Sequence, residues 1–412
     1  MSMKISYAER IGGSSFGKTE ETFKFEKIKL TKRKAQELKP GTFLIDMGVG
    51  EPDLPASGSV AKVLGQEAEK AVNRFNADNG IMEYKRAAAD YMKKVYNVNG
   101  LSSDNQICHG IGSKSILAML PLAFINPGDV AILTVPGYPI LGTTTRYLGG
   151  QVYECKLHKK NGFLPNLSEI PEAICKRAKL LYLNYPNNPT GAVANQEFYE
   201  KVVDFARKHQ IVVVNDAAYG AILYDERHPF SFLSVPGVME VGVEIHSMSK
   251  AFCMTGWRLG FIAGNEKVVK AFATIKNNMD SGQFRAIQLA GAYALKNSEL
   301  TKVQVKRYEV RMRALVDALN MVGFSAEMAA GTYYLYVKAP VAGKRADGCR
   351  VQFEDAEDAA TFLIEEAMIS IVPWTEAGNY LRWSVTYEAG EYSDQEVIEL
   401  LKKRLEQLEL SF

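Results

Sequence analysis

Apolar, strand-like runs alternate with helical patterns between about residues 60 and 300, and this alternation constrains the fold more than any other feature of the chain. The strand-like runs are 130–135, 178–184, 211–216 and, more weakly, 241–249. The helical patterns are 66–72, 84–96 and 112–123. Apolar strands separated by helices are typical of a largely parallel sheet covered on both faces. Ligands of such sheets bind beyond the carboxyl ends of the strands, so we expect the functional residues there.

The pattern changes after about residue 300. A long amphipathic helix is predicted, followed by alternating strands and helices: 300–323, 331–340, 355–368, 380–387 and 393–410. Ser393 and Glu396 have the spacing of a helix capping box. We therefore expect three regions, which are an N-terminal arm with part of a small domain, a large domain and a C-terminal small domain: 1–55, 56–300 and 301–412.

Charge and cysteine content argue against several classes of protein. The 49 basic and 47 acidic residues give a net charge of +2, which offers no electrostatic case for a nucleic-acid or membrane partner. The five cysteines are scattered and never form a C-x-x-C pair, which argues against a disulfide framework or a metal site. The N-terminal segment has no apolar stretch of signal-peptide type, and no run of about 18 apolar residues spans a bilayer. We expect a cytoplasmic protein.

Lys250 lies in the segment HSMSKAFCMTGWRLG (246–260), at the end of the last predicted strand. Ser247 and Ser249 flank it, and Arg258 follows eight residues later. A lysine that forms a Schiff base must be desolvated or close to other cations, so that its amine is neutral at physiological pH. Hydroxyl groups beside an arginine suit a phosphate dianion. The alternative is a solvated surface lysine and arginine on one loop.

Three further segments place polar residues at strand ends or at the start of a helix. Asp216 ends the run IVVVND, where it can hold a pyridinium N–H or cap the next segment. Asn188 lies in NYPNNPTG, where it can bond a ring hydroxyl or simply form a turn. Ser113 and Lys114 lie in GIGSKS and open a helix, and backbone N–H groups at a helix N-terminus attract anions.

In this order and at these separations, the four segments resemble the class I and II aminotransferases, which are pyridoxal-phosphate enzymes of fold type I. The resemblance extends from VGEPD (49–53) to YLRWS (380–384), and PNNPTG with SKAFCMTGWRLG are its most specific parts. It implies an α/β fold, in which a large domain with a mainly parallel seven-stranded sheet between helices carries a smaller α+β domain. It also implies pyridoxal 5'-phosphate as cofactor and a homodimer with shared active sites.

The resemblance assigns a role to each candidate residue. Lys250 carries the cofactor as a Schiff base and moves the proton, and Asp216 pairs with the ring nitrogen. Asn188 and Tyr219 bond the ring oxygen, and Tyr138 of PGYP stacks on the ring. The phosphate contacts are Ser113, Lys114, Ser247, Ser249 and Arg258. The contacts to the substrate α-carboxylate are Arg382 of YLRWS, the backbone of Gly50 and the side chain of Asn188.

Two segments bear on the far end of the substrate, because the resemblance places both near the partner subunit's site. Asp78 in RFNADNG offers an acid for a distal ammonium, and Arg285 in SGQFRAIQ offers a base for a distal carboxylate. The alternative is that both are solvated surface charges. Phe75 stands where the family usually presents a tyrosine to the phosphate, and we expect it to pack at the dimer interface.

The segments LIDMGVGEPD, FNADNG and GIGSK are similar to those of LL-diaminopimelate aminotransferases. This implies a ping-pong transfer from LL-2,6-diaminopimelate to 2-oxoglutarate in lysine biosynthesis. The alternatives are an aspartate, alanine or aromatic aminotransferase of broad specificity, or a C–S lyase or synthase that shares the same residues. A regulator's effector domain is disfavoured, because only about 40 polar residues precede FLIDMG and a helix-turn-helix domain needs about 60 or more. An inactive binding module is disfavoured, because Lys250, Asp216 and Arg382 are all present.

Overall fold

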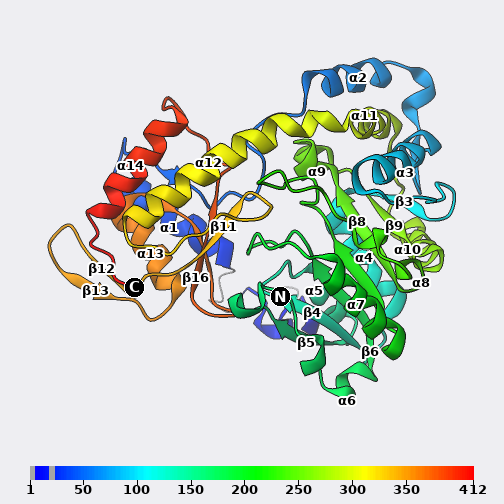
Figure 1. Ribbon diagram of the computed structural model, residues 1–412, viewed down its shortest axis with the longest axis horizontal. Coiled ribbons are helices and arrows are strands. Elements are labelled where there is room, and N and C mark those ends of the chain that lie inside the picture. The colour runs from blue at the N-terminus through cyan, green and yellow to red at the C-terminus, as the bar shows by residue number, and fades with distance from the viewer. Residues whose placement is uncertain (1–4, 18–23) are drawn as a thin grey trace.

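The computed structural model describes residues 5–17 and 24–412, and a seven-stranded sheet forms the core of its larger part, on the right in Figure 1. The strands in sheet order are β3 (Ile107–Gly110), β9 (Gly260–Gly264), β8 (Gly242–Ser247), β7 (Val212–Asp216), β6 (Ala178–Asn184), β4 (Val130–Val135) and β5 (Gln151–Lys156). Neighbours from β8 to β5 pair in parallel, and β9 alone runs antiparallel to both β3 and β8. The predicted mainly parallel α/β sheet is confirmed.

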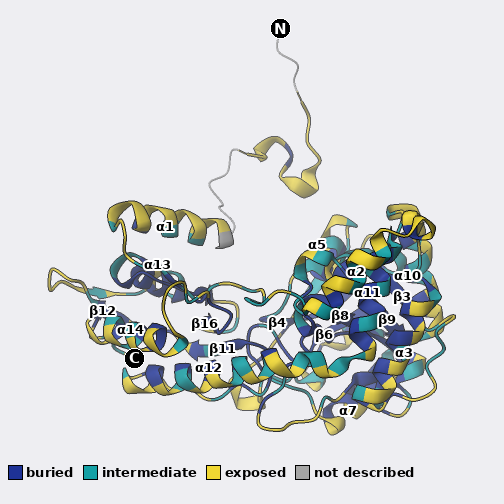
Figure 2. Cartoon of the chain, turned by 90° about the horizontal axis from the view of Figure 1, so that it is seen from above, coloured by how far each residue is buried: buried dark blue, intermediate teal, exposed yellow. Residues whose placement is uncertain are grey.

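Helices bury both faces of this sheet. On one face pack α4 (Gly112–Phe124), α5 (Ile140–Tyr147) and α10 (Glu266–Met279). On the other face pack α3 (Met82–Tyr96), α7 (Gln196–His209) and α11 (Arg285–Lys296), and α2 (Gly58–Ala68) lies over α11. Successive strand residues face opposite cores, so that Val213 lies in one and Val214 in the other. Burial on both faces explains why the central strands are continuously apolar, and Figure 2 shows them beneath exposed helix surfaces.

A second core forms around a three-stranded antiparallel sheet. Its strands in order are β11 (Tyr334–Lys338), β16 (Tyr380–Ser384) and β15 (Val372–Trp374). The helices beside it are α1 (Lys24–Leu38), α12 (Thr301–Met321), α13 (Ala356–Ala367) and α14 (Asp394–Glu406). The short strand β1 (Ile45–Asp46) joins this region by pairing in parallel with β14 (Ile369–Ser370). A smaller ribbon pairs β12 (Ala342–Lys344) with β13 (Arg350–Gln352). The boundaries at residues 55 and 300 stay a prediction.

The helix cap predicted in the second region is present, and the predicted strand differs in length. The side-chain oxygen of Ser393 accepts from the backbone N–H of Glu396, and the Glu396 carboxylate accepts from the N–H of Ser393, so the capping box of α14 is present. The strand predicted at 331–340 is shorter, Tyr334–Lys338; Leu335 and Val337 are buried on one face, and the other face becomes exposed only toward Lys338.

Other differences have clear physical reasons. The helix predicted at 66–72 is wrong: α2 ends at Ala68, and a 3-10 turn follows over Ala71–Arg74. Only Val60 of α2 is buried, so this helix has no apolar stripe that could mark its limits. Strand β5 escaped prediction because it is a mostly exposed edge strand. Within the described residues, no helix has both the length and the apolar character needed to cross a bilayer.

Candidate active site

The predicted site residues gather where parallel strands of the large sheet end. Tyr138 follows β4, Asn188 follows β6, Asp216 ends β7 and Lys250 follows β8. The register pairs Asn184 with Asp216, so the ends of β6 and β7 lie side by side. The topology therefore brings four separate sequence segments to one edge, as a doubly covered parallel sheet predicts.

Lys250 is held in the short helix α9 (Met248–Ala251), which replaces the end of the predicted strand 241–249. Its Nζ donates a hydrogen bond to the carbonyl oxygen of Gly50 at 3.0 Å. Burial lowers the pKa of Lys250 to about 8; the carboxylate of Glu51 opposes this, and the charges of Arg258 and Arg382 add to it. The amine is therefore poised to act as a nucleophile or a base close to physiological pH.

Asp216 is buried at the end of β7. Its Oδ1 accepts from the backbone N–H of Ala218 at 3.1 Å, and its Oδ2 accepts from the hydroxyl of Tyr182 at 3.3 Å. Burial raises the pKa of Asp216 to about 6, although these two hydrogen bonds and the charges of His246 and Lys250 oppose the rise. Asp216 thus caps the following turn and also presents a desolvated carboxylate that favours a cationic N–H.

An anion-binding corner forms where Arg258 meets the N-terminus of α4. The Arg258 Nη1 donates to the carbonyl oxygen of Thr255 at 2.8 Å and lies 3.4 Å from the Ser249 Oγ. Gly112 has a φ of +74°, and a Cβ on it would lie 2.4 Å from the Arg258 Nη2. The guanidinium therefore occupies space that only a glycine leaves open, directly beside the free N–H groups of α4.

The other predicted phosphate contacts differ in where they lie. The backbone N–H of Ser113 is next to the start of β9, 3.3 Å from where a Cβ on Gly260 would stand. Lys114 is exposed in the first turn of α4. The hydroxyl of Ser247 is buried and accepts from the N–H of Ser249 at 3.2 Å, so it caps α9. Ser247, Ser249 and Arg258 are thus linked by hydrogen bonds and lie near the start of α4, whereas Lys114 is exposed.

Arg382 on β16 faces the same edge and is 3% exposed. Its Nη2 donates to the carbonyl oxygen of Gly48 at 3.0 Å, and its Nη1 donates to the Asn188 Oδ1 at 3.2 Å. The guanidinium lies over the ring of Tyr334, 4.1 Å from the centroid, and its buried Nε has no hydrogen-bond partner within the described chain. A fixed, desolvated guanidinium with N–H groups to spare suits a carboxylate.

A tyrosine cluster lies between Arg382 and Lys250, and the sequence predicts its member Tyr219 but not Tyr333 or Tyr334. The hydroxyls of Tyr219 and Tyr334 are 3.2 Å apart, and the hydroxyl of Tyr333 donates to the Gly50 carbonyl oxygen at 2.8 Å. The segment GTYYLY contains the signal, since it faces YLRWS across β11 and β16. Tyr138 is partly buried nearby; burial first and then the charge of Asp216 raise its pKa.

Asp78 and Arg285 directly follow the two strands of a small ribbon that pairs β2 (Asn76–Ala77) with β10 (Gln283–Phe284). Asp78 is exposed, and the buried Nε of Arg285 has no hydrogen-bond partner among the described residues. Within the described parts of the chain, neither residue forms a hydrogen bond or an ion pair with the Lys250 group. The ribbon nevertheless contacts the phosphate-binding loop, because the Gln283 side-chain amide donates to the carbonyl oxygen of Arg258 at 2.9 Å.

Phe75 precedes the same ribbon and is 56% exposed. The guanidinium of Arg74 lies over its ring, 4.2 Å from the centroid. An aromatic ring exposed to this extent has no core packing of its own within the chain.

The geometry can hold an anion at Arg258, a cationic ring nitrogen at Asp216 and a carboxylate at Arg382, around an amine that can attack a carbonyl carbon. Residues 42–394 match the family model of class I and II aminotransferases. An LL-diaminopimelate aminotransferase of Methanocaldococcus jannaschii is 53% identical, and one of Methanococcus maripaludis is 49% identical, each over 98% of both chains.

Solved structures agree with this relationship. Substrate-bound BacF from Bacillus subtilis has a TM-score of 0.87 at 29% identity, covering 100% of this chain and 99% of its own. A single mutant of aspartate aminotransferase from Thermus thermophilus has a TM-score of 0.83 at 26% identity, covering 98% of this chain and 100% of its own. Because the family model spans most of the sequence and the sheet carries the family's motifs at its strand ends, the chain belongs to the class I and II aminotransferase family.

Proposed function

We propose that the chain transfers the α-amino group of LL-2,6-diaminopimelate to 2-oxoglutarate by a ping-pong reaction, with pyridoxal 5'-phosphate at Lys250, as a step of lysine biosynthesis. The observation that carries the proposal is the partly desolvated amine of Lys250, which bonds the Gly50 carbonyl oxygen within electrostatic reach of Asp216 and Arg382. Relatives named LL-diaminopimelate aminotransferase, at 53% and 49% identity over 98% of the chain, support the choice of substrate.

The residues at the sheet edge fit the cofactor group by group. Arg258, Ser249 and the N-terminus of α4 at Ser113 would hold the phosphate, with Lys114 and Ser247 beside them. Asp216 would hold the ring nitrogen, because a buried carboxylate gains most from a cationic N–H. The ring oxygen would be held by Asn188 and Tyr219, and the ring face by Tyr138. When bound, pyridoxal phosphate supplies an aldehyde that captures amines and a ring that withdraws electrons from the substrate α-carbon.

Lys250, Arg382 and Gly50 then have separate roles in the reaction. Lys250 would hold the cofactor through its Nζ, and the same amine, when free, would take up and return the proton of the substrate α-carbon. Arg382, fixed by Gly48, Asn188 and the ring of Tyr334, orients the substrate α-carboxylate so that this proton faces Lys250. The backbone of Gly50 keeps the Lys250 amine in place before the substrate arrives.

We propose that the active enzyme is a homodimer in which the ribbon of β2 and β10 completes the partner's site. Exposed apolar side chains beside the ribbon support this, namely Val72 at 64%, Phe75 at 56% and Met279 at 59% exposure. Asp78 and Arg285 of one chain would then read the distal ammonium and carboxylate of the substrate bound by the other. We place the enzyme in the cytoplasm, since all five cysteines are free thiols, as a reducing compartment keeps them.

The test is an assay of the purified enzyme with LL-diaminopimelate and 2-oxoglutarate, run in parallel with aspartate, alanine and an aromatic amino acid as donors. We expect glutamate to form fastest with LL-diaminopimelate. Turnover with the other donors but none with LL-diaminopimelate would overturn the substrate. Release of ammonia or a thiol without any need for an oxo acid would overturn amino transfer in favour of a lyase.

A further inference from the structure

Glu172, Cys175 and His209 meet at the opposite edge of the large sheet from Lys250. Glu172 and Cys175 are the ends of α6 (Glu172–Cys175), which comes just before β6, and His209 ends α7, just before β7. The two strands are neighbours and pair Leu180 with Val212 near their amino ends. Since β7 is five residues long, the cluster lies roughly 15–20 Å from the Asp216 edge.

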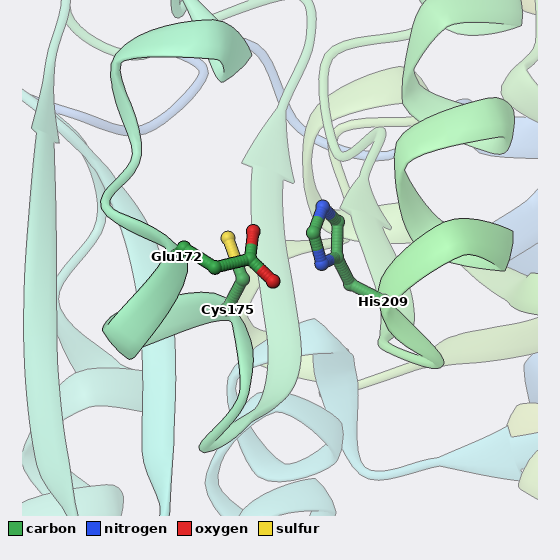
Figure 3. Close-up of side chains that lie close together, drawn as sticks. All are labelled: Glu172, Cys175 and His209. Carbon is green, nitrogen blue, oxygen red and sulfur yellow. The ribbon is translucent and has the colours of Figure 1, made fainter.

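The three side chains offer a carboxylate oxygen, a thiol sulfur and an imidazole nitrogen, all within 4.8 Å of one another. Figure 3 shows the carboxylate and the thiol reaching from α6 toward the imidazole at the end of α7. Zinc bonds of about 2.0–2.3 Å place the ligand atoms of a tetrahedral site roughly 3.3–3.8 Å apart. Each pair is therefore within about 1.5 Å of tetrahedral spacing, and rotation of the exposed Glu172 and the partly buried His209 side chains can bring the ligand atoms closer together.

The three side chains make few other contacts within the described chain. Within the described chain, neither the Glu172 carboxylate nor the His209 ring has a hydrogen bond or an ion pair. The His209 ring packs on Phe205 with centroids 4.7 Å apart, and the Cys175 sulfur has one long contact, 3.9 Å, to the carbonyl oxygen of Ile170. All three line one groove of about 780 Å³, with Glu172 exposed, His209 partly buried and Cys175 buried in its wall.

We propose that Glu172, Cys175 and His209 bind a zinc-type divalent cation that clamps α6 to α7 and thereby fastens the amino ends of β6 and β7. A mixed sulfur, nitrogen and oxygen set selects a borderline-soft ion, because Mg²⁺ and Ca²⁺ require oxygen ligands. Water fills the fourth position, on the groove side. The thiol proton leaves to solvent when the metal–sulfur bond forms, and no electron is transferred.

Sequence reasoning expected no metal site, because it looked for paired cysteines. Here the thiol and carboxylate are three residues apart on one short helix, and the histidine follows 34 residues later, after a strand. Only the packing of α6 beside the end of α7 brings them together.

The test uses the holoenzyme, treated with a chelator, dialysed and titrated with Co²⁺. The wild-type protein should gain the absorption of a cobalt–thiolate bond, saturating at one ion per chain, and Zn²⁺ should displace it. C175S should abolish this absorption and H209Q should weaken binding at least about tenfold. C349S removes an exposed cysteine outside the cluster and serves as the matched control, with an unchanged titration.

A thermal melt gives a second readout. Zn²⁺ at about 100 times its Kd should raise the wild-type Tm by about 3 °C, and leave the Tm of C175S unchanged. E172Q should also lose the Zn²⁺-dependent rise in Tm, and it leaves the core undisturbed because Glu172 is exposed. Amino-transfer activity should not depend on the metal, since the clamp lies far from Lys250. Equal titrations and equal melts for wild type and C175S would overturn the site.

Discussion

The amine of Lys250 donates a hydrogen bond, 3.0 Å long, to the carbonyl oxygen of Gly50, which lies 200 residues earlier in the chain. The same carbonyl accepts from the hydroxyl of Tyr333, which belongs to the second core. The N-terminal segment therefore links the amine of the large sheet to the small antiparallel sheet. The site exists only where the two cores pack together.

Replacement of Lys250 by alanine should reduce the turnover number by at least about 1,000-fold, since it removes both the covalent attachment and the base. K250R is the matched control, because it keeps a positive charge but no nucleophilic amine, and it should be equally inactive. Added methylamine should restore part of the K250A activity by supplying a free base. Activity of K250A within tenfold of wild type would contradict the assignment.

The lowered pKa of Lys250 should appear in the stability of the cofactor-free protein. The pKa is about 8 in the folded chain and 10.5 in the unfolded chain, so the unfolded chain binds more protons between these values. Stability should therefore rise with pH across this window, by at most about 3 kcal/mol from this group. Urea unfolding of wild type and K250M at pH 8 and pH 10 isolates the contribution. A constant difference between the two proteins would argue against a desolvated amine.

Asp216 should destabilise the cofactor-free protein, although the residue is essential for activity. Its pKa is about 6 when folded against 3.8 when unfolded, so the folded chain binds more protons in that window and stability falls as pH rises through it. D216N should therefore be more stable than wild type at pH 7.5, by at most about 3 kcal/mol, and this gain should vanish below pH 4. Turnover should fall at least about 100-fold. Urea unfolding and the amino-transfer assay measure the two effects.

The ring of Tyr334 should hold Arg382 for substrate. The guanidinium lies 4.1 Å from the ring centroid in a buried setting, where a cation–π contact contributes up to about 2 kcal/mol. Y334L should raise KM for the amino donor by up to about 30-fold. Y334F keeps the ring and loses only the hydroxyl contacts to Tyr219 and Gly50, so its KM should stay within about threefold. Equal KM values for the two variants would show that the ring does not position Arg382.

The sequence predicts Lys250, Asp216 and Arg258 but not all of the tyrosines that surround them. Strands β4 and β6 match the predicted limits because burial on both faces makes their apolar runs continuous, and Asp216 stands where such a run ends. Arg258 and Lys250 share one short motif. Tyr182 reaches Asp216 only because β6 lies next to β7, and Tyr333 reaches Gly50 only across the two cores. Strand order and the packing of the cores depend on long-range contacts that no local pattern contains.

Asp78 and Arg285 give the sharpest test of the shared site. If the ribbon serves the partner subunit, D78A/R285A should lose activity toward LL-diaminopimelate while keeping activity toward shorter donors, and K250A should be inactive with all of them. Refolding equal amounts of the two variants together makes half of the dimers mixed. Each mixed dimer has one site with an intact Lys250 and an intact ribbon, so about a quarter of the wild-type activity should return. No recovery in dimers verified as mixed would mean that the ribbon serves its own chain, because no site would then contain both intact parts.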